Sequence, residues 1–452
     1  MNNRTTRGWR YAVYLLYGLL CTAFLYLTPR SEFEQLIVLY GGMFLVYVLL
    51  TRTSESKDHI QDAIVAGILL RIIATFAAPN LTDDHYRFIW DGQLVAHGYN
   101  PYTMTPEQVR AAGFLGMEGI NTELFSKLNS ASYISVYPPI AQALFGLAAK
   151  VSFDSWNIQV LVIKLMLLAF ECSTIVLLPE ILRKIKLPEG HALWYILNPL
   201  IIIELSGNMH VEGIMVYTLL LSLYWYYSGR HTASAIAFGF AVSAKLWPLM
   251  LLPVFFRPLG FKNTMRYSVI AGSVALVLLS PMLLQFTQIS GSLNLYFQQF
   301  EFNGSIFYIG KYLFNKEADY EAFSAMRATL PFLACAAILL LSVFYKKHAL
   351  TTGMLMAFSV YLLFATTVHP WYLAPVILLS VLSGYRFGIL WSLLIYLTYY
   401  TYITPAYIEN TFFIWIEYTA VIVFAIWEFS KRPFLDTEQW QSYLQCTRTL
   451  LK

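Results

Sequence analysis

The chain has 452 residues, of which 58% are hydrophobic and only 12% are charged; its mean hydropathy is +0.56 and its net charge is +4. This balance excludes an ordinary soluble domain. Apolar runs of about 20 residues recur along the whole chain, which is the length that an α-helix needs to cross a bilayer, whereas a β-barrel would show short segments of alternating polarity. The sequence therefore predicts an all-α polytopic membrane protein, with residues 1–452 in a single domain.

Charge and cysteine content exclude further classes. The basic residues lie in short segments between apolar runs, so no nucleic-acid partner is expected. The chain has no Gly-rich phosphate loop or Rossmann pattern for a nucleotide. The four cysteines are scattered, without metal-site or disulfide spacing: Cys21, Cys172, Cys335 and Cys446.

The N-terminal part of the chain sets the expected orientation. The first apolar run lacks a small-residue cleavage site and is interpreted as a membrane span. The basic residues Arg4, Arg7 and Arg10 place the N-terminus in the cytoplasm by the positive-inside rule. Three spans are expected before residue 79, at about 9–28, 33–50 and 60–78. Residues 79–137 then form a first large extracytoplasmic loop.

The same rule orders the rest of the chain. A short apolar stretch at 138–151 is interpreted as a half-span or re-entrant element, because a full crossing would put the basic run from Arg183 to Lys186 outside. A second extracytoplasmic loop is expected at 287–325. The other spans are expected at about 157–180, 191–207, 212–228, 232–245, 246–257, 267–286, 326–345, 349–368, 371–384, 387–403 and 411–429. In total the chain is expected to cross the membrane about 13 to 14 times.

A polar segment from Thr82 to Tyr102 follows the third span. If it is helical, Asp84, Arg87 and Asp91 share one face, and Asp83 and Arg87 are also an i, i+4 pair. Carboxylates next to a membrane-length segment are costly unless they are solvated, paired or used. The segment is therefore interpreted as the edge of an active site. The alternative is that the two adjacent aspartates only cap a helix.

The expected topology brings polar residues of five separate segments to the same membrane face. These residues are Asp83, Asp84, His85, Asp91, Asn208, His210, Glu212, Lys245 and His369. Taken singly, several have structural alternatives: Lys245 could snorkel from a helix end, and His369 could be a structural histidine. His210 and Glu212 lack the further ligands of a metal site. Their convergence favours a site at the outer leaflet.

The expected spans contain ionisable residues, among them Lys164, Glu171 and Glu204. Lys164 and Glu171 are seven residues apart on one helical face and could pair with each other or across helices. Glu204 lies near the outer end of its expected span and could line the cavity.

Several motifs together resemble a known superfamily. They are DD-x-x-R-F-x-W-D-G from Asp83, G-Y-N-P-Y from Gly98, Y-P-P-I from Tyr137, G-N-M-H-V-E from Gly207, A-K-L-W-P from Ala244 and H-P-W-Y from His369. This succession resembles bacterial GT-C glycosyltransferases that use polyprenyl-phosphate sugars. It looks most like the polyprenyl-phosphate-mannose-dependent mannosyltransferases. The resemblance implies a GT-C-like helical bundle whose extracytoplasmic loops carry the active site.

The resemblance also implies roles for the polar residues. Such families carry an acidic catalytic base in the first large outer loop, which falls on Asp83 or Asp84; because the two are adjacent and not spaced D-x-D, either could be the base. We expect Asp84, helped by His369, to accept the proton of an acceptor hydroxyl. The expected reaction is an inverting single displacement. The expected substrate-binding residues are Arg87, Asp91, Asn100, Tyr137, Asn208, His210, Glu212 and Lys245, with Lys245 and Arg87 as phosphate partners.

The expected function is therefore the transfer of a hexose, which the resemblance indicates to be mannose. The donor is a polyprenyl-phosphate sugar, and the acceptor is a glycolipid or a lipid-linked glycan. No cofactor is expected, because a Lys or Arg can neutralise one phosphate, although adjacent aspartates could hold a divalent metal. The protein is expected in a bacterial plasma membrane with its site facing outwards. The alternative is a transporter or flippase, but the internal repeats and midplane polar residues common in transporters are not visible.

Overall fold

The computed structural model describes residues 3–52, 56–113, 116, 119–152, 155–314, 320–344 and 350–431. Within this part the chain is almost entirely helical, and its only extended pairing is an isolated parallel bridge between Phe302 and Thr367. The expected all-α class is confirmed. Cys446 and the side chains of Arg4 and Arg7 lie outside the described part.

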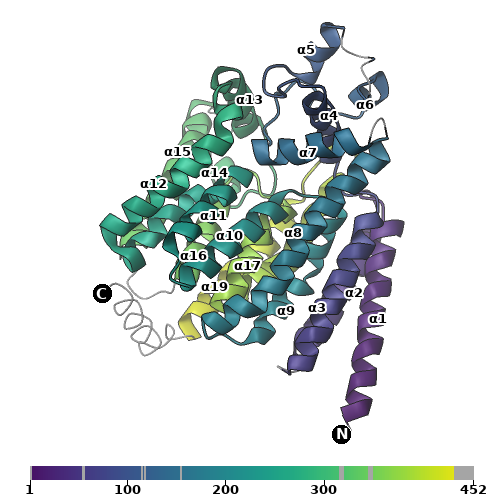
Figure 1. The fold of residues 1–452 in the computed structure, drawn as a ribbon, viewed down its shortest axis with the longest axis vertical. Helices are drawn as coiled ribbons and strands as arrows, with labels where there is room; N and C mark the ends of the chain where they lie inside the picture. The colour runs from purple at the N-terminus through teal and green to yellow at the C-terminus, as the bar shows by residue number, and fades with distance from the viewer. Residues whose placement is uncertain are drawn as a thin grey trace.

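Figure 1 shows the arrangement of the helices. The first half of the chain contains α1 (Asn3–Leu27), α2 (Phe33–Arg52), α3 (Lys57–Phe76), α4 (Asp84–Ala96), α5 (Pro106–Ala111), α6 (Thr122–Ser126), α7 (Pro139–Ser152), α8 (Trp156–Lys184), η1 (Glu189–Ala192), α9 (Leu193–Ile196), η2 (Ile201–Gly207) and α10 (Glu212–Tyr227). The second half contains α11 (His231–Ala244), η3 (Trp247–Phe255), α12 (Phe256–Leu283), α13 (Phe286–Gln299), α14 (Ile306–Leu313), α15 (Tyr320–Phe344), α16 (Leu350–Phe364), η4 (Pro370–Leu373), α17 (Ala374–Ser383), α18 (Phe387–Leu394), η5 (Ile395–Tyr402) and α19 (Thr411–Lys431).

Seven helical segments in the described part are long and apolar enough to cross a membrane. They are Gly8–Leu27, Phe33–Arg52, Lys57–Phe76, Trp156–Lys184, Trp247–Leu283, Tyr320–Phe344 and Thr411–Lys431. Three further apolar helices are shorter: His231–Ala244, Leu350–Phe364 and Pro370–Ser383. The polytopic character is confirmed, while the long helices number about half of the crossings expected from hydropathy.

Several expected spans are broken into shorter pieces. The stretch at 191–207 contains η1, α9 and the π-helical turn η2. The break follows from Asn198 and Pro199: proline has no N–H to donate, and the Asn198 side chain accepts from Leu200 N at 3.0 Å in place of a helical carbonyl. The stretch at 387–403 likewise changes from α-helix to a 3-10 segment at Ile395. Hydropathy registers the apolar run but not these interruptions.

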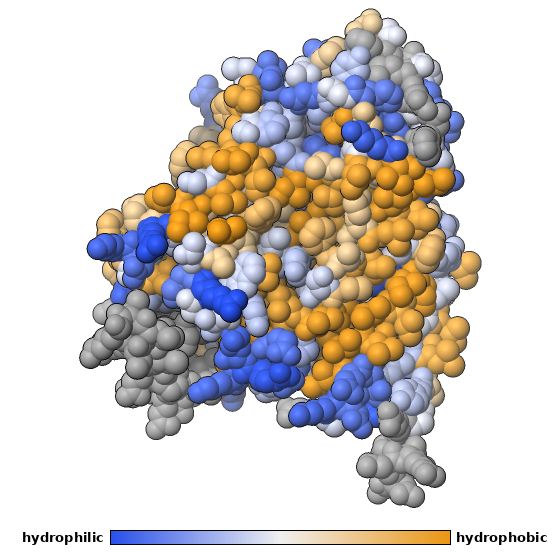
Figure 2. Space-filling view, viewed as in Figure 1, coloured by the Kyte–Doolittle hydropathy of each residue, from blue (hydrophilic) through white to orange (hydrophobic). Residues whose placement is uncertain are grey.

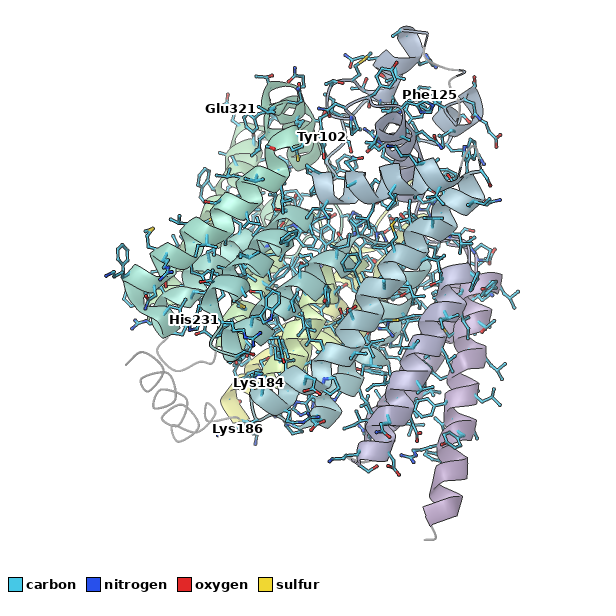
Figure 3. All side chains as sticks on the ribbon, in the orientation of Figure 1. Tyr102, Phe125, Lys184, Lys186, His231 and Glu321 are labelled. Atoms are coloured by element: carbon cyan, nitrogen blue, oxygen red, sulfur yellow. The ribbon has the colours of Figure 1, made fainter. Side chains whose placement is uncertain are left out.

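The surface is consistent with a membrane protein. Figure 2 shows a broad band of apolar residues between polar residues at the two ends of the molecule. In Figure 3, Tyr102 and Phe125 lie at one end, and Lys184 and Lys186 lie at the other. The first end carries α4 to α7, and the second end carries the start of α1 (Figure 1).

Buried charges inside the bundle are compensated by partners on other helices. Glu171 on α8 accepts from Arg71 Nε on α3 at 2.9 Å, and Tyr195 donates to its other oxygen at 2.8 Å. Lys164 Nζ donates to the carbonyls of Ala74 and Ala77 at the end of α3, where the helix dipole favours a cation. Lys164 and Glu171 thus make their bonds across helices and not with each other.

The helix that begins with Asp84 rests on α7. In Figure 1, α7 lies across the long helices and not along them, which agrees with the expected half-span at 138–151. Gly92 permits the close approach of α4, because a Cβ there would lie 2.5 Å from the carbonyl oxygen of Phe145. Phe88 stacks on the Phe145 ring with centroids 4.5 Å apart. The helix of the Thr82–Tyr102 segment is therefore packed tightly on α7.

Candidate active site

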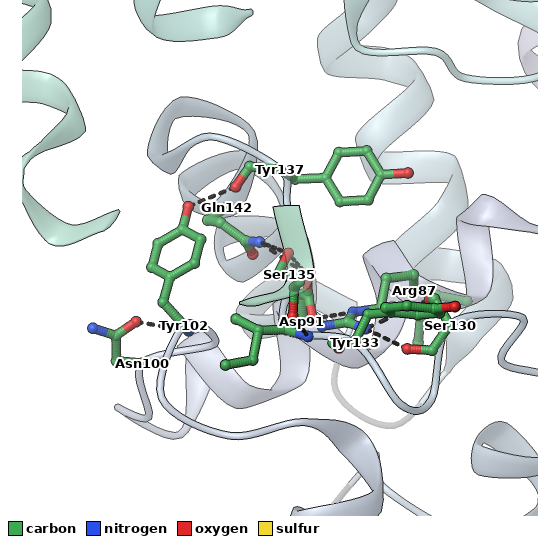
Figure 4. A network of polar contacts seen from close by, with 12 residues as sticks. Arg87, Asp91, Asn100, Tyr102, Ser130, Tyr133, Ser135, Tyr137 and Gln142 are labelled. Atoms are coloured by element: carbon green, nitrogen blue, oxygen red, sulfur yellow. Dashed lines mark hydrogen bonds and ion pairs between the residues drawn. The ribbon is translucent and has the colours of Figure 1, made fainter. Parts of the chain in front are cut away.

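A buried polar network fixes the loop between α6 and α7 against α4 (Figure 4). Arg87 Nε donates to Asp91 Oδ1 at 2.7 Å, and Arg87 Nη1 donates to the carbonyls of Ser130 and Tyr133, each at 2.9 Å. The second oxygen of Asp91 accepts from the side chains of Ser135 and Gln142. The Arg87 and Asp91 side chains are only 4% and 0% exposed. Both side chains therefore hold the backbone of this loop in place.

Asn100 and Tyr137 belong to the neighbouring part of this network (Figure 4). The Asn100 side chain accepts from Tyr102 N at 3.0 Å. The buried Tyr102 hydroxyl donates to the carbonyl of Tyr137 at 2.6 Å. The Tyr137 ring packs edge-on against Phe88, with centroids 4.8 Å apart. The two residues join the Gly98–Tyr102 turn to the Tyr137-Pro-Pro segment; their expected contact with substrate stays a prediction.

The two adjacent aspartates at the start of α4 have different partners. Asp83 Oδ2 accepts from Arg30 Nη2 at 2.8 Å, so it pairs with the α1–α2 turn and not with Arg87. Asp84 Oδ1 accepts only a long bond, 3.3 Å, from the amide of Asn129. Neither carboxylate caps the helix by bonding one of its backbone N–H groups. Within the described part of the chain, the Asp84 carboxylate thus has the weaker bond of the two and no ion pair.

Arg30 and Tyr402 connect the aspartates with the last third of the chain. The guanidinium of Arg30 lies over the Tyr402 ring, 4.4 Å from its centroid. The Tyr402 ring also contacts Phe302, with centroids 6.2 Å apart.

A run of contacting rings brings the predicted histidines together. His210 stacks on Trp371 with centroids 3.7 Å apart, and Trp371 stacks on His369 at 4.5 Å. His369 in turn stacks on Phe302 at 4.5 Å. The bridge between Phe302 and the strand-like segment at Thr367 fixes this last contact, because Val368 N donates to Phe302 O at 2.8 Å. Residues from three distant segments therefore form one aromatic cluster.

The predicted lysine lies beside this cluster. Lys245 Nζ donates to Glu212 Oε1 at 2.7 Å, and its side chain is 23% exposed. The ammonium lies over the rings of Trp247 and Tyr372, 4.7 and 5.6 Å from their centroids. Tyr372 also meets His369 edge-on. Glu212 and Lys245 thus form a half-buried ion pair at the rim of the aromatic cluster.

Glu204 connects the aromatic cluster with the tyrosines near residue 400. Its carboxylate is fully buried and accepts from the hydroxyls of Tyr396 and Tyr399 at 2.7 and 2.8 Å and from Asn208 Nδ2 at 3.1 Å. His210 Nε2 lies 3.4 Å from the same carboxylate. Asn208 Oδ1 accepts from the backbone N–H of Leu81, just before the aspartates. Glu204 therefore does not line an open cavity but holds the surrounding residues in position.

The histidines of the site differ from ordinary surface histidines. Burial, followed by the proximity of His210 and Lys245, lowers the pKa of His369 to about 3. Burial lowers the pKa of His85 to about 4, although its ring bonds the carbonyl of Thr82. Both imidazoles are consequently neutral at physiological pH and can accept hydrogen bonds.

The predicted site residues thus fall into two groups. The structure joins Asn208, His210, Glu212, Lys245 and His369 in one cluster, which Arg30 and Tyr402 connect with Asp83 and Asp84. It places Arg87, Asp91, Asn100 and Tyr137 in the network that shapes the loop. Among the described residues no group of three or more His, Cys, Asp or Glu side chains could hold a metal ion.

Sequence reasoning missed Arg30, Tyr396, Tyr399, Tyr402 and the role of Trp371. Arg30 stands alone in a short turn, where a basic residue usually indicates only orientation. The tyrosines follow Trp391 in an aromatic run that resembles a membrane-interface belt. The one usable signal was Glu204 itself, since a carboxylate inside an apolar run needs several donors.

Comparison with known proteins gives two matches. Alpha-(1->6)-mannopyranosyltransferase A of Corynebacterium glutamicum is 24% identical over 208 residues, which cover 43% of this chain and 40% of that protein. The chain therefore matches two fifths of that relative's length. No solved structure matches. A family model described as "Alpha-(1->6)-mannopyranosyltransferase, N-terminal domain" matches residues 12–258, more than half of the chain and a range that contains Arg30, Asp83, Asp84 and Lys245. The protein belongs to this mannopyranosyltransferase family.

Proposed function

We propose that the protein is an alpha-mannosyltransferase that takes mannose from a polyprenyl-phosphate-linked donor. The acceptor is a hydroxyl of a glycolipid or of a lipid-linked glycan. The family match over residues 12–258 is the observation that carries the proposal. The apolar band supports a lipid-linked donor, because it indicates that the protein lies in the bilayer that would hold a prenyl chain.

The chemistry assigned to the site is a single displacement. The acceptor oxygen forms a bond to the anomeric carbon of mannose while the bond from that carbon to the donor phosphate oxygen breaks. The electron pair of the broken bond stays on the phosphate, and the acceptor proton passes to a carboxylate. Attack from the face opposite to the leaving phosphate inverts the anomeric centre.

Asp84 is the better candidate for the base. Asp83 is neutralised by Arg30 at 2.8 Å, whereas the bond from Asn129 to Asp84 is long and uncharged. A positioned general base contributes roughly 10²- to 10⁴-fold in rate. His369, kept neutral by its low pKa, is assigned as a hydrogen-bond acceptor beside the reacting groups. Lys245 is the candidate that the sequence offers for binding the donor phosphate.

The site is assigned to the extracytoplasmic face. Lys184 and Lys186 lie at the end of the molecule opposite to Tyr102 (Figure 3), and positive charge marks the cytoplasmic end of a membrane protein. In this orientation the aspartates at the start of α4 face outwards.

The test is transfer of radiolabelled mannose from polyprenyl-phosphate mannose to acceptors in membranes that contain the protein. The wild type is expected to transfer mannose, and Asp84→Asn is expected to lose at least 100-fold of the rate while donor binding persists. Asp83→Asn is expected to lose less. Full turnover in Asp84→Asn would eliminate the base assignment. Wild-type protein that moves the labelled lipid across vesicles but transfers no mannose would favour the flippase alternative.

A further inference from the structure

Arg30 lies at the membrane surface, the level at which the phosphate of a lipid-linked molecule is held. It belongs to the short turn between α1 and α2, and both helices are long and apolar enough to cross the membrane. A turn between two spans is at the bilayer surface. The phosphate of a prenyl-linked donor is confined to the same surface, because its chain is in the hydrocarbon and its charge is not.

The guanidinium is held in place but keeps hydrogen-bond donors available. Nη2 donates to Asp83, and the plane lies over the Tyr402 ring. Within the described part of the chain, Nε and Nη1 of Arg30 have no hydrogen-bond partner. The side chain is 21% exposed, so it is not closed off from an anion. A guanidinium presents paired donors that match two oxygens of a phosphate.

The two cations expected from the sequence to bind phosphate make more contacts with the protein than Arg30 does. Arg87 is 4% exposed and bonds Asp91 and two carbonyls. Lys245 bonds Glu212 at 2.7 Å and lies over two aromatic rings. Arg30, in contrast, lies next to Asp83 and hence one residue from the proposed base.

We propose that Arg30 binds the phosphate of the lipid-linked donor and stabilises the charge that develops on it as the sugar leaves. This inference rests on the proposed function. The donor phosphodiester carries one negative charge, and the leaving polyprenyl phosphate gains the electron pair of the broken bond. The guanidinium therefore interacts more strongly with the leaving group than with the donor, which is the condition for catalysis. Asp83 acts as a positioning residue that orients Arg30.

The experiment compares Arg30→Gln and Arg30→Lys in full-length protein in membranes. Mannose transfer from polyprenyl-phosphate mannose is measured together with inhibition by the product, polyprenyl phosphate. Arg30→Gln is expected to lower kcat/KM by about 10²-fold and to raise the inhibition constant of polyprenyl phosphate at least about 10-fold. Arg30→Lys keeps the charge but not the paired donors. Its kcat/KM and its inhibition constant are expected to lie between those of the wild type and of Arg30→Gln.

Arg10→Gln is the matched control, because Arg10 lies on α1, the helix that leads into the turn of Arg30, and pairs with Asp62 at 3.4 Å. It is expected to retain transfer and product inhibition. The expression level and melting temperature of each variant show whether it folds. If Arg30→Gln does not fold, the inhibition constant of Arg30→Lys tests the proposal in its place. Inorganic phosphate is expected to inhibit only weakly; inhibition equal to that of polyprenyl phosphate would overturn the assignment to a lipid-linked donor.

The outcomes separate the two proposals. Absence of transfer by the wild type would overturn the proposed function. Normal transfer by the wild type with an unchanged inhibition constant in Arg30→Gln would overturn this inference alone, and would assign Arg30 to tethering the α1–α2 turn.

Discussion

The imidazole of His210 stacks on the indole of Trp371 with ring centroids 3.7 Å apart and planes inclined by 16°. The same indole contacts His369. One side chain therefore sets the spacing of two histidines that are more than a hundred residues apart in the sequence.

Replacement of Trp371 should consequently affect the reaction more than the fold. We expect Trp371→Ala to lower kcat/KM for mannose transfer at least about 10-fold, because both imidazoles lose their stacking partner. Its stability should fall by about 1–3 kcal/mol, since the ring is half-buried. Trp371→Phe keeps a stacking face and should retain most of the activity. Equal rates in the Ala and Phe variants would contradict this role.

Loss of one member of the Arg87–Asp91 pair should destabilise the protein strongly. Asp91→Asn leaves a buried guanidinium without its counter-charge, which typically costs about 3–5 kcal/mol. The melting temperature in detergent measures the effect. The exposed i, i+4 pair of Glu123 and Lys127 is the matched control, and Glu123→Gln should cost less than about 0.5 kcal/mol. Similar losses from the two variants would show that the buried network does not support the loop.

The crossing of α4 and α7 should not tolerate a side chain at Gly92. Gly92→Ala places a methyl group 2.5 Å from the Phe145 carbonyl oxygen and from Gln159 Nε2, and we expect a loss of about 1–3 kcal/mol. Gly41 is also helical, but a Cβ there meets no atom within 4 Å. Gly41→Ala should therefore be neutral or slightly stabilising. Melting temperatures of the two variants compare them directly, and an unaffected Gly92→Ala would contradict the tight crossing.

Stability should fall as the pH drops below about 6.5, in part because of His85. Its pKa is about 4 in the folded protein and about 6.5 in an unfolded chain. Between these values the unfolded chain binds a proton that the folded protein excludes, so acid favours unfolding. His85→Gln should reduce the loss of stability between pH 7 and pH 5 by about 1–2 kcal/mol.

The exposed His97 at the end of the same helix provides the control for this experiment. His97→Gln should leave the acid-induced fall in melting temperature unchanged. An identical pH dependence in His85→Gln and the wild type would rule out the contribution of His85.

The sequence was informative where the chain itself brings residues together. Arg87 and Asp91 are one helical turn apart, and their placement on a shared face follows from spacing alone. The grouping of His210, Lys245 and His369 followed from hydropathy and the charge rule, because each residue lies between apolar runs. These two kinds of information require no knowledge of how the helices pack.

Contacts that depend on packing could not be derived in this way. The i, i+4 spacing allowed Asp83 to pair with Arg87, yet Asp83 pairs with Arg30, because the α1–α2 turn packs against the start of α4. Two of the donors to Glu204, the hydroxyls of Tyr396 and Tyr399, come from nearly two hundred residues further along the chain. The break inside the expected span at 191–207 was also missed, since Asn198 and Pro199 interrupt an apolar run without changing its hydropathy.

The hydrogen bonds of the buried Glu204 carboxylate determine where the chain can be truncated. The family model ends at residue 258, but the two phenol groups that bond Glu204 belong to Tyr396 and Tyr399. A fragment cut at that boundary would retain the aspartates and lose two of the three side chains that donate hydrogen bonds to this carboxylate. The end of the family match at residue 258 therefore marks a limit of sequence similarity, and it separates Glu204 from two residues that bond its carboxylate.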